Sequence, residues 1–167
     1  MKDDNKILKI VYTFFLGFLL AMFIGLGINT FYEGPKEPEY PIGIDAYTSK
    51  QLTDEQAKKQ HDYEVAMAKY NKEMQPYNRN VSIIALIASV ILLVVSLMYE
   101  KKIKIISDGV LLGGLFTLLY SLIRGFASQD TKYVFIVVTI GLIVALYLGY
   151  HRFVKPTTAT TTKKSKK

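Results

Sequence analysis

Asp108 is the residue in this 167-residue chain whose type and position most suggest chemistry. Its carboxylate falls in a long apolar segment, where an ionisable group is costly to keep and so indicates an ion or proton site. A second interpretation needs no site. Asp108 stands near a predicted helix N-terminus, with Ser107 as an optional cap, and follows Lys104 by four residues, so the helix dipole and an ion pair would stabilise it.

Patterns for catalysis, metals or redox chemistry are absent from the sequence. There is no cysteine, which excludes disulfides and thiolate sites. The two histidines, His61 and His151, lie outside the apolar core of any segment, which argues against paired-histidine haem ligation. The zinc-protease, nucleophile-elbow and phosphate-loop strings do not occur. We therefore expect no enzyme activity, no metal and no cofactor.

The amino-acid composition indicates the class of protein in which Asp108 and the other polar residues occur. Half of the residues are apolar and the mean hydropathy is +0.21, yet the chain also has 21 basic and 14 acidic residues and a net charge of +7. One small globule cannot accommodate both tendencies without burying charge or exposing a large apolar surface. The two kinds of residue must be segregated along the chain, as in a multi-pass membrane protein.

Four apolar segments are long enough, or nearly long enough, to cross a hydrocarbon core: residues 10–32, 81–99, 105–124 and 133–151. The third has the shortest uninterrupted apolar run, yet its small residues favour it as the central helix. We predict an all-α integral membrane protein with four transmembrane helices in a bundle. One extracytoplasmic helix is expected in the long loop between the first two spans.

Basic residues near the span ends predict the orientation. Most of them fall in residues 1–9, 100–104 and 152–167, which places both termini in the cytoplasm and leaves loops 33–80 and 125–132 outside. The cell membrane is the expected location. Arg124, at the outer end of the third span, is expected to extend to the interface near Asp130.

Small residues four apart recur on the first, third and fourth spans and predict close helix packing, because backbones approach where side chains are small. The residues are Gly17, Ala21, Gly25, Gly109, Gly113, Thr117, Ser121, Gly141, Ala145 and Gly149. Ordinary packing within one chain explains them, and the alternative is a pore, a substrate cavity or an oligomer contact. The second span offers Ser82, Ser89 and Ser96 at seven-residue spacing.

The loop 33–80 divides into a proline-rich leader, residues 33–48, and a helix over about 53–75 that should end before Pro76. Thr53 and Gln56 form a capping-box pattern at its start. One side of this helix carries a tyrosine and methionine seam: Tyr63, Met67, Tyr70, Met74 and Tyr77. The seam is expected to bind a partner membrane protein or a second copy. The alternative is that it packs on the bundle or on lipid headgroups.

The C-terminal tail lacks residues that could pack and ends in Lys163, Lys164, Lys166 and Lys167, which could attract anionic lipid. No aromatic or arginine residues are interleaved with these lysines, so we expect no nucleic acid binding.

Two hypotheses for function follow. The first is a non-enzymatic accessory, scaffolding or assembly subunit of a membrane complex that uses the tyrosine and methionine helix for recognition. The second is a small oligomeric transporter or channel with Asp108 near its cytoplasmic mouth.

Overall fold

The computed structural model describes residues 2–41 and 53–154 of the chain. These residues form four α-helices: α1 (Lys2–Phe31), α2 (Asp54–Tyr99), α3 (Lys104–Ala127) and α4 (Thr131–Gly149). A π-helical turn, η1 (Tyr150–Val154), continues α4. No strand occurs in the described ranges. Each α-helix is long and apolar enough to cross a membrane, so the predicted all-α class and the number of long apolar helices are confirmed.

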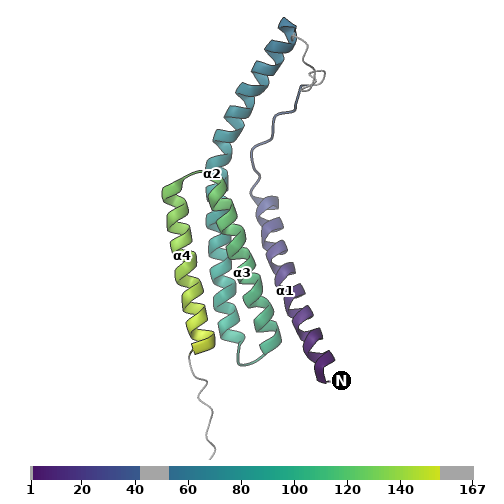
Figure 1. Cartoon of the computed structure of the whole chain (residues 1–167), viewed down its shortest axis with the longest axis vertical. Helices are drawn as coiled ribbons and strands as arrows, with labels where there is room; N and C mark the ends of the chain where they lie inside the picture. The colour runs from purple at the N-terminus through teal and green to yellow at the C-terminus, as the bar shows by residue number, and fades with distance from the viewer. Residues whose placement is uncertain (1, 42–52, 155–167) are drawn as a thin grey trace, which may run out of the picture.

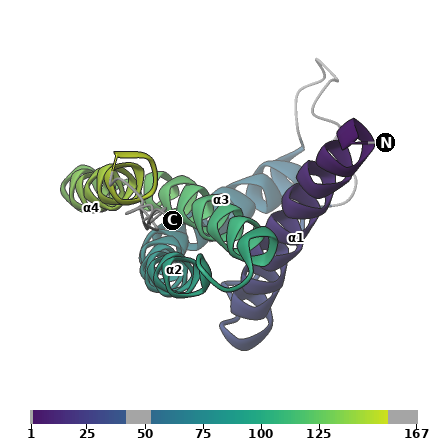
Figure 2. The ribbon, with the colours of Figure 1, turned by 90° about the horizontal axis from the view of Figure 1, so that it is seen from below.

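The helix α3 lies at the centre of the bundle, where it contacts α1, α2 and α4. Within the described residues α1 and α4 do not touch each other, and Figure 2 shows them on opposite sides of α3. The prediction that the third span is the central helix is confirmed. Its buried residues explain the position, since they include Gly109, Gly113, Gly114 and Ser121, which let neighbouring backbones come close.

One end of the bundle holds the start of α1, the α2–α3 connection and the end of α4 (Figure 1). We call this the basic end, because it carries these described basic residues: Lys6, Lys9, Lys101, Lys102, Lys104 and Arg152. The apolar surface between the two ends is largely exposed in the single chain, with Phe23 and Phe135 each more than 70% accessible. Exposure of this kind suits a hydrocarbon environment.

The helix expected to end before Pro76 does not end there, and this prediction is wrong. It begins as predicted, with Thr53 as N-cap and a complete capping box to Gln56. It then runs through Pro76 into the second apolar segment as one helix of 46 residues, about 69 Å long at 1.5 Å per residue. A proline in a helix interior costs about 3 kcal/mol, because it lacks an N–H and its ring clashes with the carbonyl group four residues earlier.

Contacts on both sides of Pro76 explain why the helix continues. Gln75 Nε2 donates to Gln129 Oε1 at 3.0 Å. Tyr77, one residue beyond the proline, is buried against Val81, Ala85 and Ile28. Buried residues of α2 begin at Tyr77, so residues 54–76 form a stalk that extends past the bundle (Figure 1).

Other helix limits also differ from the prediction, most clearly the starts of the first and last helices. The first helix begins at Lys2 rather than at residue 10, since polar residues can extend a helix beyond its apolar stretch. The last begins at Thr131, where Asp130 is the N-cap and accepts a hydrogen bond from the Tyr133 backbone N–H at 3.1 Å. Gln129 has a positive φ of 57°, which turns the chain directly after α3.

Candidate functional site

Glycines bring α1 and α3 into close contact. A Cβ added to Gly113 would lie 2.9 Å from Leu20 Cβ and 3.2 Å from the Gly17 carbonyl oxygen. A Cβ on Gly109 would lie 2.6 Å from Leu16 Cδ2, and one on Gly17 would lie 2.9 Å from Leu112 Cβ. The distances of 2.6 and 2.9 Å are shorter than real Cβ contacts, so only glycine fits these three positions without a shift of its neighbours. Gly17, Gly109 and Gly113 therefore form an intramolecular packing contact.

Other members of the predicted stripes do not pack in this way. Nothing lies within 4 Å of a Cβ built on Gly25 or Gly149. Ala145 is exposed and Ala21 is half-buried. Gly141 is buried, but a Cβ there would meet only Leu118 and Leu122 at 3.8 Å, which is ordinary contact. The regular spacing of the small residues predicted more close contacts than the structure contains, because α4 lies less closely against α3 than α1 does.

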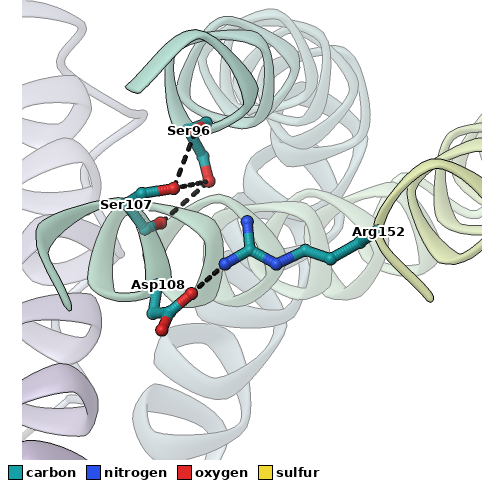
Figure 3. Close-up of polar contacts among 4 residues, drawn as sticks. All are labelled: Ser96, Ser107, Asp108 and Arg152. Carbon is teal, nitrogen blue, oxygen red and sulfur yellow. Dashed lines mark hydrogen bonds and ion pairs between the residues drawn. The ribbon is translucent and has the colours of Figure 1, made fainter. Parts of the chain in front are cut away.

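Serines join α2 to α3 at two levels. Ser82 Oγ donates to the Ser121 carbonyl oxygen and Ser121 Oγ donates to the Ser82 carbonyl oxygen, both at 2.8 Å. Ser96 and Ser107 repeat this reciprocal pair near the basic end, also at 2.8 Å (Figure 3). All four side chains are fully buried. The arrangement satisfies each hydroxyl donor and fixes the alignment of the two helices.

Two other buried polar residues, Ser89 and Thr117, bond within their own helices. Ser89 Oγ donates to the Leu86 carbonyl oxygen at 2.7 Å, and Thr117 Oγ1 donates to the Gly113 carbonyl oxygen at 2.8 Å. Ser107 was expected as an optional cap of the third span, but Ile103 is the N-cap position and makes no side-chain cap bond. Ser107 instead belongs to the pair with Ser96.

Asp108 forms an ion pair with Arg152, in which the guanidinium Nη2 donates to carboxylate Oδ1 (Figure 3). The Arg152 side chain reaches across from η1 and is only 10% exposed, whereas the Asp108 side chain is 34% exposed. Among the described residues Asp108 makes no ion pair with Lys104, so that expected partner is wrong. The guanidinium Nη1 and the His151 Nδ1 are buried without a hydrogen bond from the described part of the chain.

Arg124 was expected to extend to the interface near Asp130, but among the described residues it makes no ion pair with Asp130. Its Nη1 donates to Asn78 Oδ1 at 2.8 Å and its Nε donates to Tyr120 Oη at 3.1 Å. The guanidinium carbon also lies 5.9 Å from the centre of the Tyr77 ring. Cation–π contacts and two hydrogen bonds hold the charge inside the bundle end, where α2 leaves it.

The seam is not an open surface, because part of the chain's own leader lies against it. Tyr32 stacks on Tyr77 with ring centroids 5.3 Å apart, and Tyr40 meets Tyr63 edge to face at 5.2 Å. Gly34 lies so close to Tyr77 that an added Cβ would sit 3.0 Å from the ring. Tyr63, Met67, Tyr70 and Met74 are half-buried and Tyr77 is buried. The expectation that the seam packs on the bundle holds only for Met74 and Tyr77, which join the cluster of Ile28 and Val81.

Sequence reasoning missed three of these relationships: Asp108 with Arg152, Arg124 with Asn78, and the leader with the seam. Each joins residues far apart in the sequence, for which local spacing carries no signal. The seven-residue spacing of Ser82, Ser89 and Ser96 indicated a polar face, although not its partners. The predicted lipid-binding lysines, Lys163, Lys164, Lys166 and Lys167, and residues 42–48 of the leader lie outside the described residues.

The fold therefore defines an all-helical protein with four helices long and apolar enough to cross a membrane. In comparisons with protein-family models, curated proteins and solved structures, nothing matches the chain. Its function must be inferred from its own residues.

Proposed function

We propose that the chain is a non-enzymatic, multi-pass subunit that assists the assembly or scaffolding of a membrane complex. In this proposal the four helices cross the cell membrane with both termini in the cytoplasm, and the stalk with its leader recognises a partner protein outside. The observation that carries it is the continuity of α2, which connects the stalk to the buried centre of the bundle without a loop.

Polar groups inside the bundle support a structural role. The serine hydroxyls of α2 and α3 donate to carbonyl groups, and Asp108 is paired with Arg152. Since the serine hydroxyls and the Asp108 carboxylate already have partners within the chain, these contacts favour a structural role over substrate binding. The stalk, by contrast, presents charged residues and Val65, which is 56% exposed.

The leader and the seam side of the stalk lie together and form one surface. Because Tyr40 and Tyr63 are in contact, a partner that binds the seam side meets proline-rich chain and helix together. In our proposal the seam acts in recognition indirectly, by holding the leader in place. Extended proline-rich segments lose little conformational entropy on binding, which suits them for recognition.

The transporter hypothesis has less support from these contacts. A conducting path would need Asp108 to face water, yet its charge is compensated by Arg152. The substitution Asp108→Asn tests it directly. A transporter would lose flux while keeping its assembly, whereas an assembly subunit would show no flux in either form.

A photo-reactive amino acid at Glu39 of the leader, which is exposed beside the contact between Tyr40 and Tyr63, tests the proposal in the full chain in native membranes. We expect one adduct of defined mass. The matched control is the same amino acid at Leu119 of α3, which is 54% exposed but lies on the bundle. Combining the Glu39 probe with Tyr63→Ser and Met67→Ser should abolish the adduct, because the leader loses its contact.

An adduct that persists in the seam variant would show that the seam does not hold the leader for recognition. Adducts of equal yield at Glu39 and Leu119 would indicate non-specific neighbours. The absence of any adduct at Glu39 would contradict the proposed function.

A further inference from the structure

A groove opens between α1 and α3 at the basic end, with a volume of about 650 Å³. Its lining is mainly apolar and includes Ile10, Phe14, Ile103 and Leu112. Lys9 and Lys104 are its two basic residues, one from each helix. Next to the groove the helices come into close contact at Gly17 and Gly113. The groove is therefore a surface-accessible site bounded by two fixed helices.

The charge of the groove is positive in spite of Asp108, which also lines it. The Asp108 carboxylate is already paired with Arg152, so its negative charge is compensated. Lys9 and Lys104 are exposed, and neither makes an ion pair with another residue in the described ranges. Two uncompensated ammonium groups thus face the same apolar groove.

The apolar lining of the groove continues into the exposed apolar surface of the bundle, which suits a hydrocarbon environment. Ile10 is 69% exposed and Phe14 is 56% exposed. A soluble anion would satisfy the lysines but would leave the apolar walls in contact with water. A ligand with an anionic head and an apolar chain matches both parts of the groove, because lysine heads stay at the interface while apolar side chains meet acyl chains.

We propose that this groove binds one anionic glycerophospholipid. The ammonium groups of Lys9 and Lys104 hold its phosphate, and one acyl chain lies along Ile10, Phe14 and Leu112. The inference requires that the basic end lies at a membrane surface, but it does not depend on recognition by the stalk.

The test uses the intact chain in nanodiscs of phosphatidylcholine containing a small fraction of phosphatidylglycerol, with retained lipid counted by native mass spectrometry. The test variant carries Lys9→Gln and Lys104→Gln. The matched control carries Lys101→Gln and Lys102→Gln, which remove the same charge from the same end but do not line the groove. The tail lysines remain in every form and contribute equally.

We expect the wild type and the control to retain one phosphatidylglycerol, and the test variant to bind it about 10-fold more weakly or worse. Thr13→Trp, which fills the groove without changing charge, should cause a similar loss. An equal loss in the test variant and the control would overturn the proposal, since it would show diffuse attraction to the whole basic end. Unchanged retention in the test variant would overturn it as well. If the double variant misfolds, Lys9→Gln and Lys104→Gln are compared separately with Lys101→Gln.

Discussion

The ring of Tyr32 stacks on the ring of Tyr77 at a centroid distance of 5.3 Å with planes within 4° of each other. The Tyr77 hydroxyl also donates to the Tyr32 carbonyl oxygen at 3.2 Å. This relationship joins the end of α1 to the point where α2 leaves the bundle. It places the leader beside the stalk, because Gly34 follows Tyr32 by only two residues and contacts the same ring.

Tyr77→Ala should lower the free energy of unfolding by about 3 kcal/mol, since it removes a buried aromatic ring. Tyr77→Phe keeps the stacking and loses only the hydrogen bond, so about 1 kcal/mol is expected. Unfolding in mixed micelles with increasing SDS measures both. A loss for Tyr77→Phe as large as that for Tyr77→Ala would show that the hydroxyl, not the ring, holds the leader.

Ser96→Ala and Ser107→Ala should each cost about 0.6 kcal/mol, which is typical of interhelical hydrogen bonds in membrane proteins. Their effects should add only in part in the double variant, because each hydroxyl donates to a backbone carbonyl that remains after the other substitution, while the two Oγ atoms also lie 3.3 Å apart. Ser89→Ala is the control, since Ser89 is equally buried but bonds within its own helix. Complete additivity with Ser96→Ala and Ser107→Ala in a double-mutant cycle would show that the contact between the two hydroxyls contributes nothing.

Gly113→Ala should destabilise the contact between α1 and α3, because the new methyl group would meet Leu20 and the Gly17 backbone. The matched change Gly25→Ala meets open space and should be neutral, or stabilising by up to about 1 kcal/mol through helix propensity. Disulfide trapping between cysteines introduced at Leu16 and Leu112 reports the α1–α3 distance in each variant. Equal trapping rates with Gly113→Ala and with Gly25→Ala would argue against a packed glycine contact.

Glu55 lies in the first turn of the stalk, and its pKa is lowered from the ordinary value of 4.5 by a hydrogen bond and by charge attraction from Lys59. A lowered folded-state pKa means that the contribution to helix stability is present above the unfolded value and is lost as pH falls through the folded value. Acidification below about pH 4.5 should therefore increase fraying at residues 54–59.

Hydrogen exchange across the stalk, compared between pH 6 and pH 3.5 after correction for intrinsic rates, measures this fraying. Glu55→Gln should remove the part of the pH dependence that arises from the ion pair between Glu55 and Lys59. The nearby pair Lys69–Glu73, with 3.9 Å between Nζ and Oε1, is the internal comparison. Equal pH dependence with and without Glu55→Gln would assign the effect to other carboxylates of the stalk.

Much of the fold could be predicted because its signals are local. Apolar runs defined the four long helices, and the capping box at Thr53 defined the start of the second. Pro76 led to a wrong prediction of the helix end. A proline ends a helix only when no contact on either side of it keeps the two helical segments aligned. Here Gln75 and Tyr77 are both held, so the helix continues.

The candidate site was less predictable, because its decisive contacts depend on how helices align. Lys104 precedes Asp108 by one turn and was the natural partner from spacing alone. The orientation of α3 relative to η1 places the Asp108 carboxylate next to Arg152 instead. Lys104 is thereby left unpaired within the described residues and faces the groove.

The two serine pairs also have a mechanical consequence. Ser82 and Ser96 are fourteen residues apart on α2, and their partners Ser121 and Ser107 are fourteen residues apart on α3. Both pairs therefore share one register, and sliding α2 along α3 by a single residue would break both together. A pulling force applied to the stalk would therefore load both pairs at once, because both must break before α2 can slide along α3.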